Sequence, residues 1–199
     1  MHWGGRSVRI ALILLSLNVG CRHEAAQQVT AETTPESDPV VLHKDARAIA
    51  LAAKEALFAR LSGRLADVIK ADGPAAAIKV CSHEASEIAR TVSDEHGVTI
   101  GRTAIKLRNP NNQPPEWVKP LIEVPSPEPQ FVELPGGHTG ALLPIKLKAE
   151  CVVCHGPAQG IADDVKSQLA ELYRLDEATG FREGDLRGWF WVDVPDVNQ

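Results

Sequence analysis

Residues 151–155 of the chain read Cys151-Val152-Val153-Cys154-His155, a C-x-x-C-H pattern. This spacing is that of a c-type haem attachment site. Two thiols one helical turn apart can form thioethers to both haem vinyl groups, and the adjacent imidazole can then bind the iron from one side. The pattern therefore predicts one covalent haem c, attached through Cys151 and Cys154, with His155 as an axial ligand of the iron.

The same spacing has two other uses, which the sequence does not favour. A zinc site needs four ligands, usually completed by a second pair at comparable spacing, and the chain has no second C-x-x-C and no H-x-x-x-H. A thioredoxin-like redox pair follows a strand within a βαβ unit, and no such unit is indicated before residue 151. Haem attachment is therefore the favoured interpretation.

Haem attachment of this kind takes place outside the bacterial cytoplasm, so the interpretation requires an export signal. Arg6 and Arg9 precede the apolar run Ile10–Gly20, which has the length of a signal-peptide core and is too short to span a bilayer. Cys21 follows at once, as in the lipobox of bacterial lipoproteins. We expect residues 1–20 to be a lipoprotein-type signal peptide. The protein would then be periplasmic and held to a membrane by lipid on Cys21, with plain secretion as the alternative.

The rest of the chain divides into a tether and one domain. Residues 21–41 are polar with no apolar period, which predicts a flexible tether. Residues 42–199 suffice for one domain with a sizeable core. The formal net charge of −5 becomes more negative once the signal arginines are removed. This balance argues against nucleic acid and for a small molecule or a basic redox partner.

Cys81 is the cysteine that neither lipid nor haem attachment uses. Such a thiol is either a small buried hydrophobe or the sixth ligand of the iron. Gly73 and Pro74 mark the start of a helix, and Cys81 lies in the middle of its apolar stripe. The stripe comprises Ile78, Cys81, Ala85, Ile88 and Val92. His83, two residues further on, falls on the polar side.

Few residues other than Cys81 could serve as the sixth ligand of the iron. The only methionine is Met1, in the signal segment, so the His/Met ligation of electron-carrier cytochromes c is excluded. His43, His96, His138 and an open position remain. His96 falls at a helix end and His138 in a glycine loop. Spacing favours Cys81, followed by His138.

Apolar periodicity predicts an α+β fold with N-terminal helices and an antiparallel sheet. A long amphipathic helix is expected over residues 42–71, and another near 161–172. Alternation predicts strands around Val98–Leu107 with a bulge at Gly101, around Leu143–Leu147 and at Phe190–Val194. The proline-rich stretches between these strands indicate loops.

Two arginines are candidates to bind the haem propionates. Arg102 lies within the first predicted strand and Arg108 directly after it, and a planar guanidinium pairs with carboxylates bidentately. The alternative is that both are ordinary solvent-facing arginines. Asp176, Asp185 and Arg187 flank glycine turns, so we expect them to brace loops.

Four separated stretches resemble a family of c-type haem domains with a PAS-like fold and largely unassigned function. They are Val80–Ala89, Arg102–Pro114, Cys151–Gly156 and Asp176–Gly188. The family occurs as single exported proteins and as sensor modules of receptors. The resemblance covers about residues 42–194 and implies a PAS-like fold. It also implies that the iron is held by His155 and by the cysteine at position 81. Trp189–Val192 is bulkier than the small residues expected there.

These features suggest three kinds of function. A thiolate ligand would stabilise ferric iron and lower its reduction potential, which favours an exported protein that transfers electrons or senses redox state or a diatomic gas. A haem enzyme acting on peroxide or nitrogen oxides would need a distal acid or base, and none is evident on the inner face of the Cys81 helix. The third is a ligand-binding module in which the haem is structural.

Overall fold

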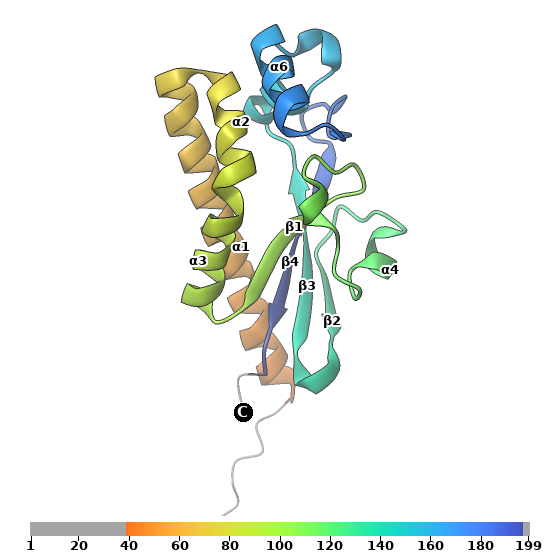
Figure 1. Ribbon diagram of the computed structural model, residues 1–199. Coiled ribbons are helices and arrows are strands. Elements are labelled where there is room, and N and C mark those ends of the chain that lie inside the picture. Colours follow the sequence, from red (N-terminus) through yellow and green to blue (C-terminus); the bar gives the residue numbers. More distant parts are fainter. Residues whose placement is uncertain (1–38, 197–199) are drawn as a thin grey trace, which may run out of the picture. The chain divides into compact units, whose positions relative to one another are not determined.

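The computed structural model describes residues 39–196, with side chains from residue 45 onward (Figure 1). The predicted signal peptide, Cys21 and most of the predicted tether lie outside the described residues. The helices are α1 (Pro39–Asp72), α2 (Pro74–His83), α3 (Ala85–His96), α4 (Lys119–Ile122), α5 (Val152–His155) and α6 (Asp163–Leu172), and the strands are β1 (Thr99–Thr103), β2 (Gln130–Glu133), β3 (Thr139–Lys146) and β4 (Leu186–Val194).

The predicted α+β class, with N-terminal helices and an antiparallel sheet, is confirmed. The four strands follow the order β1-β4-β3-β2, and each neighbouring pair is antiparallel. Figure 1 shows α1, α2 and α3 on one side of the sheet and α4 on the other. None of the helices within residues 39–196 is both long enough and apolar enough to cross a membrane.

The long helix α1 buries the apolar stripe that its sequence predicts. Its inward residues pack against the helix-facing side of β3 and β4, where Leu143, Phe190 and Val192 are buried. The fully or almost fully buried residues of α1 are Ala46, Ala50, Ala53, Leu57, Leu61 and Val68. Spacings of three and four residues put these side chains on one face. The helix ends before Gly73, whose φ of 84° few other residues tolerate, and Pro74 begins α2.

The helix that carries Cys81 is shorter than its periodicity suggests. The stripe through Val92 predicts one helix, but α2 ends at His83 and α3 begins at Ala85. At the junction Arg64 of α1 donates two hydrogen bonds to the Glu84 carboxylate, at 2.7 and 2.9 Å. No glycine or proline marks this break, so the sequence carries no local signal of it.

The first predicted strand needs two corrections. Gly101 is not a bulge, because β1 pairs with β4 in unbroken register and Gly101 lies opposite Trp191. A Cβ at Gly101 would overlap the indole of Trp191, so the glycine leaves room for that ring. The strand also ends at Thr103, and Ile105, which was predicted to continue it, is exposed. The register shift in the sheet lies between Ile145 and Lys146 instead.

The other face of the sheet is covered by the segment between β1 and β2. Val118, Leu142 and Trp189 form a small buried cluster there, and the Trp189 indole N–H donates to the Ser126 carbonyl at 3.1 Å. Alternation along β4 thus sends Trp189 to this cluster and Phe190 to the helices. β2, which the sequence did not predict, lies between the two proline-rich loops.

Candidate cofactor site

A cavity of about 510 Å³ opens between the helices and the sheet. The six residues predicted for the site all line it: Cys81, Arg102, Arg108, Cys151, Cys154 and His155. The apolar walls include Leu61, Leu65 and Ile69 of α1, Ile78 of α2, Leu147 and Phe190. A concave, mostly apolar cavity with a few convergent polar groups is typical of a cofactor site.

The C-x-x-C-H segment forms one tight helical turn at the cavity. A short 3-10 turn over Ala149–Cys151 leads into α5, so the thiols of Cys151 and Cys154 follow each other by one turn and both line the cavity. Gly156 is extended and ends the helix, and a Cβ there would meet the backbone of Val152. Among the described residues, Cys81, Cys151 and Cys154 form no disulfide.

The imidazole of His155 has a defined tautomer. Its Nδ1 lies 2.7 Å from the carbonyl oxygen of Ala178, and because a carbonyl can only accept, the proton is on Nδ1 and Nε2 keeps its lone pair. Arg187 Nε lies 3.3 Å from the same Nδ1, but both groups carry protons, so this is a contact and not a hydrogen bond. Burial, followed by Arg108 and Arg187, lowers the pKa of His155 to about 3. The ring is therefore neutral at pH 7, as a metal ligand requires.

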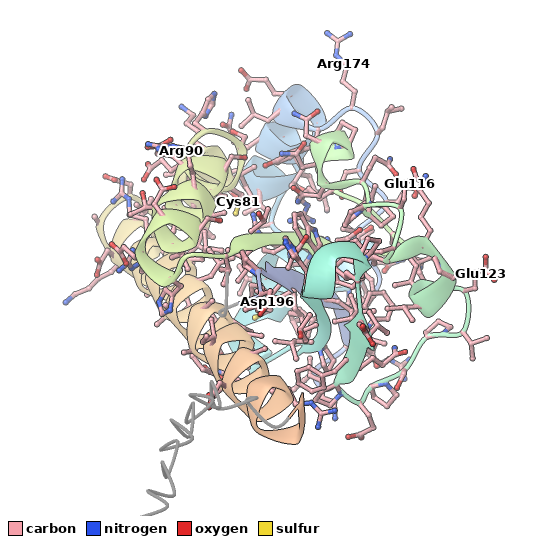
Figure 2. All side chains as sticks on the ribbon, turned by 90° about the horizontal axis from the view of Figure 1, so that it is seen from below. Cys81, Arg90, Glu116, Glu123, Arg174 and Asp196 are labelled. Carbon is pink, nitrogen blue, oxygen red and sulfur yellow. The ribbon has the colours of Figure 1, made fainter. Side chains whose placement is uncertain are left out.

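Cys81 lies on the inner side of α2. Figure 2 shows it facing the interior, whereas Arg90 of α3 points outward. Burial raises the pKa of the Cys81 thiol, and Arg102 and then Arg108 oppose this rise. The predicted exposure of His83 on the same helix is observed. The structure thus brings the leftover cysteine into the same cavity as the C-x-x-C-H turn.

The competing imidazoles lie elsewhere. His138 precedes β3 and contacts Asp193 at 2.7 Å, whereas the cavity is lined by Ile145 and Leu147 at the opposite end of that strand. His96 ends α3 and does not line the cavity. The side chain of His43 falls outside the described residues.

Arg102 is a cation without a partner at the cavity. It lies opposite Phe190 in the β1–β4 register, so its side chain is on the helix-facing side of the sheet. Among the residues that the structure describes, nothing forms a hydrogen bond or an ion pair with it. Burial lowers its pKa, and the nearby Cys81 and Tyr173 oppose this effect.

Arg108 differs from Arg102 because the protein itself binds it. It is 7% exposed and donates from Nε to Asp176 at 3.1 Å. Its Nη2 donates to the carbonyl oxygens of Cys154 at 2.6 Å and Ala178 at 3.2 Å. The alternative that this arginine faces solvent is wrong. Asp176 braces a loop, as predicted.

Arg187 and Tyr173 are neighbours of the site that sequence reasoning did not assign to it. Arg187 lines the cavity and donates from Nη1 to the Lys106 carbonyl at 3.0 Å. Burial and then Arg108 lower its pKa to about 10. Tyr173 is 6% exposed, and burial and then Cys81 raise its pKa to about 12. The positions of both side chains depend on contacts with residues far away in the sequence, so the local sequence does not indicate them.

The zinc alternative finds no site in the part of the chain that the structure describes. There, no three side chains among histidine, cysteine, aspartate and glutamate come close enough to share a metal ion. The three cavity cysteines are therefore not arranged as a tetrahedral thiolate centre.

Fold and site together define a class: α+β domains in which a C-x-x-C-H turn and a third cysteine face one apolar cavity. The chain belongs to the Tll0287-like family, whose model matches residues 13–195. This confirms the family resemblance drawn from the four sequence stretches. A solved structure, of the cyanobacterial haem protein Tll0287, shares the fold with 23% identity and a TM-score of 0.54, over 82% of this chain and 99% of that one. No curated protein gave a significant match.

Proposed function

We propose that the chain is an exported protein with one c-type haem, whose iron is bound by His155 and Cys81 and works at low potential in electron transfer or in redox or gas sensing. The observation that carries the proposal is the convergence of Cys81 with the C-x-x-C-H turn in one cavity. Two attachment thiols, a neutral imidazole and a third sulfur are the groups that such a haem requires.

The cavity suits a haem in size and in polarity. Its volume of about 510 Å³ falls among sites for cofactor-sized molecules, and its walls combine aliphatic side chains with Phe58 and Phe190. An apolar wall also keeps water from the iron and influences the reduction potential. The family match to a haem protein points the same way.

The charges at the cavity favour an anionic ligand. Arg102, Arg108 and Arg187 all line it, and of the three only Arg108 has a carboxylate partner within residues 45–196. Haem propionates would supply negative charge to Arg102 and Arg187, in the bidentate geometry that a guanidinium favours. Arg108 keeps Nη1 available, so the prediction that it also binds a propionate stands beside its internal role.

The sixth ligand decides what the centre can do. Iron binding removes the proton of a coordinating thiol, and Arg102 and Arg108 partly oppose the rise that burial causes in the pKa of the Cys81 thiol. When bound, the haem supplies a one-electron redox centre, and an anionic sulfur ligand lowers its potential relative to a His/Met site. This supports electron transfer or sensing rather than donation to a high-potential oxidase.

The two alternative functions receive less support from the site. A haem enzyme needs a distal acid or base. Among the described residues that line the cavity His155 is the only histidine, and the only carboxylate, Glu150, is next to Cys151 in the attachment segment. A binding module with a structural haem would need a second ligand in the same cavity.

The ligand assignment is tested with the full chain expressed together with a bacterial cytochrome c maturation system. We expect an intact mass that includes one haem and a six-coordinate ferric spectrum that changes in Cys81→Ala. His83→Ala, on the exposed side of the same helix, is the matched control and leaves the spectrum unchanged. Colourless protein without the haem mass would overturn the proposal, and a Cys81→Ala spectrum identical to wild type would overturn the sulfur ligand.

Localisation is part of the same proposal. Acylation of Cys21 would anchor the domain to a membrane on the periplasmic side. Metabolic labelling with a radioactive fatty acid should mark the wild-type chain and not Cys21→Ser, and fractionation should move that variant to the soluble periplasm. Equal labelling of both chains would contradict lipidation at this residue.

A further inference from the structure

A buried ion pair is bonded to the backbone that holds the imidazole of His155. Arg108 and Asp176 have side chains that are 7% and 10% exposed, and Arg108 Nε donates to Asp176 Oδ2 at 3.1 Å. Removing two charges from water is costly unless their other hydrogen-bonding groups are also satisfied. Here they are satisfied by the backbone around His155.

The pair holds the one carbonyl to which His155 donates. Asp176 Oδ1 accepts from the Ala178 N–H at 2.8 Å, and Arg108 Nη2 donates to the Ala178 carbonyl oxygen at 3.2 Å. That oxygen also accepts from Nδ1 of His155 at 2.7 Å. Arg108 Nη2 donates to the Cys154 carbonyl as well, at 2.6 Å. The hydrogen bonds therefore form a closed ring through Arg108, Asp176, Ala178 and the C-x-x-C-H turn.

Backbone hydrogen bonds join the same three chain segments around this ring. Glu177 N donates to the Leu107 carbonyl at 2.9 Å, Gly180 N to Gly156 at 2.8 Å, and Phe181 N to His155 at 3.0 Å. The segment 176–181 is thus fixed on both the Arg108 loop and the C-x-x-C-H turn. The geometry of the imidazole depends on this segment.

We propose that Arg108 and Asp176 are positioning residues for His155. They hold the Ala178 carbonyl where it keeps the proton on Nδ1, which leaves Nε2 as the iron-binding nitrogen and increases its electron donation to the metal. The inference rests on the proposed function, since it assigns His155 as a ligand. It gives Arg108 a role through His155, distinct from that of a propionate partner.

The direction in which each variant shifts the midpoint potential distinguishes a positioning role from a direct effect of charge. Asp176→Asn and Arg108→Gln both weaken the hold on the Ala178 carbonyl, so the imidazole donates less and ferric iron loses stabilisation. Both variants should therefore raise the midpoint potential. If the charges acted only through space, loss of the carboxylate would raise the potential and loss of the guanidinium would lower it. The same lowering is expected if Arg108 only binds a propionate.

The experiment uses the full haem-loaded chain, with potentiometric titration and electron paramagnetic resonance of the ferric form. We expect both single variants to shift the potential upward and to change the low-spin g values, and Arg108→Gln/Asp176→Asn to shift it by less than the sum of the singles. Glu95→Gln removes a carboxylate from the exposed Arg60–Glu95 pair between α1 and α3 and should leave both readouts unchanged. Opposite shifts, or unchanged readouts with only a lower melting temperature, would overturn the proposal.

A second measurement does not depend on the iron. Nitrogen chemical shifts of His155 in Cys151→Ser/Cys154→Ser protein should report the Nδ1–H tautomer, and adding Asp176→Asn should give a mixture of tautomers. An unchanged tautomer in the added variant would overturn the positioning role. Failure of the proposed function is separately visible, as a wild-type mass that lacks haem.

Discussion

Gly101 on β1 lies beneath the indole of Trp191 on β4, its register partner, with no room left for a Cβ. Gly101→Ala should therefore destabilise the fold by about 1–3 kcal/mol, the usual cost of forcing an extra methyl into packed space. Chemical denaturation measures this loss. Because the obstacle is one ring, Gly101→Ala/Trp191→Ala should cost little more than Trp191→Ala alone. A double variant that shows the full sum of both losses would contradict the contact.

Gly63 offers the opposite case on α1. It lies in the helix interior, is exposed, and a Cβ there would meet nothing within 4 Å. Gly63→Ala should stabilise the protein by about 0.5–1 kcal/mol, since alanine loses less backbone freedom when the helix forms. Thermal and urea unfolding should both show the gain. A loss of stability would mean that α1 is not regular at this position.

The Arg64–Glu84 pair should give part of the stability an acid dependence. Its hydrogen bonds hold the pKa of Glu84 below the ordinary value of 4.5. A carboxylate with a depressed folded-state pKa contributes stability that is present above the unfolded-state pKa and is lost as pH falls through the folded-state value. Glu84→Gln should therefore be less stable than wild type above about pH 4.5. Unfolding midpoints measured from pH 7 to pH 3 should converge at the acid end, and a constant difference would refute the linkage.

Arg102 should act on the proposed centre through its charge. It is unpaired among the described residues and has the largest influence of any charged group on the Cys81 thiol. Arg102→Gln should lower the midpoint potential, because a nearby cation favours the reduced and less positive iron, and Arg102→Lys should recover part of the change. Spectroelectrochemical titration provides the measurement. A potential that rises in Arg102→Gln would exclude this electrostatic role.

Features governed by short-range periodicity were predictable from the sequence. The stripe of α1, the inward position of Cys81 and the outward position of His83 follow from spacings of three and four residues. The turn Cys151–His155 is likewise determined by a short stretch of sequence. The family and the α+β class are confirmed, whereas the PAS likeness, the covalent link and the iron ligands stay predictions.

Features that depend on distant partners were not predictable. The break at Glu84 coincides with an ion pair to another helix, and Gly101 is explained by a ring from a strand far along the chain. Arg108 and Asp176 are 68 positions apart, so no local pattern announces their contact. In the sequence Arg187 resembles an ordinary turn residue, whereas in the structure it lies in β4 beside His155.

The order of the strands has a consequence for how the domain assembles. β4 is the last described strand along the chain, yet it lies between β1 and β3, and β1 pairs with no other strand of the described sheet. β1 and the β2–β3 pair are therefore synthesised before β4, the strand that joins them. Such non-local pairing slows folding. A chain interrupted before Leu186 would leave β1 unpaired and the floor of the cavity without Phe190.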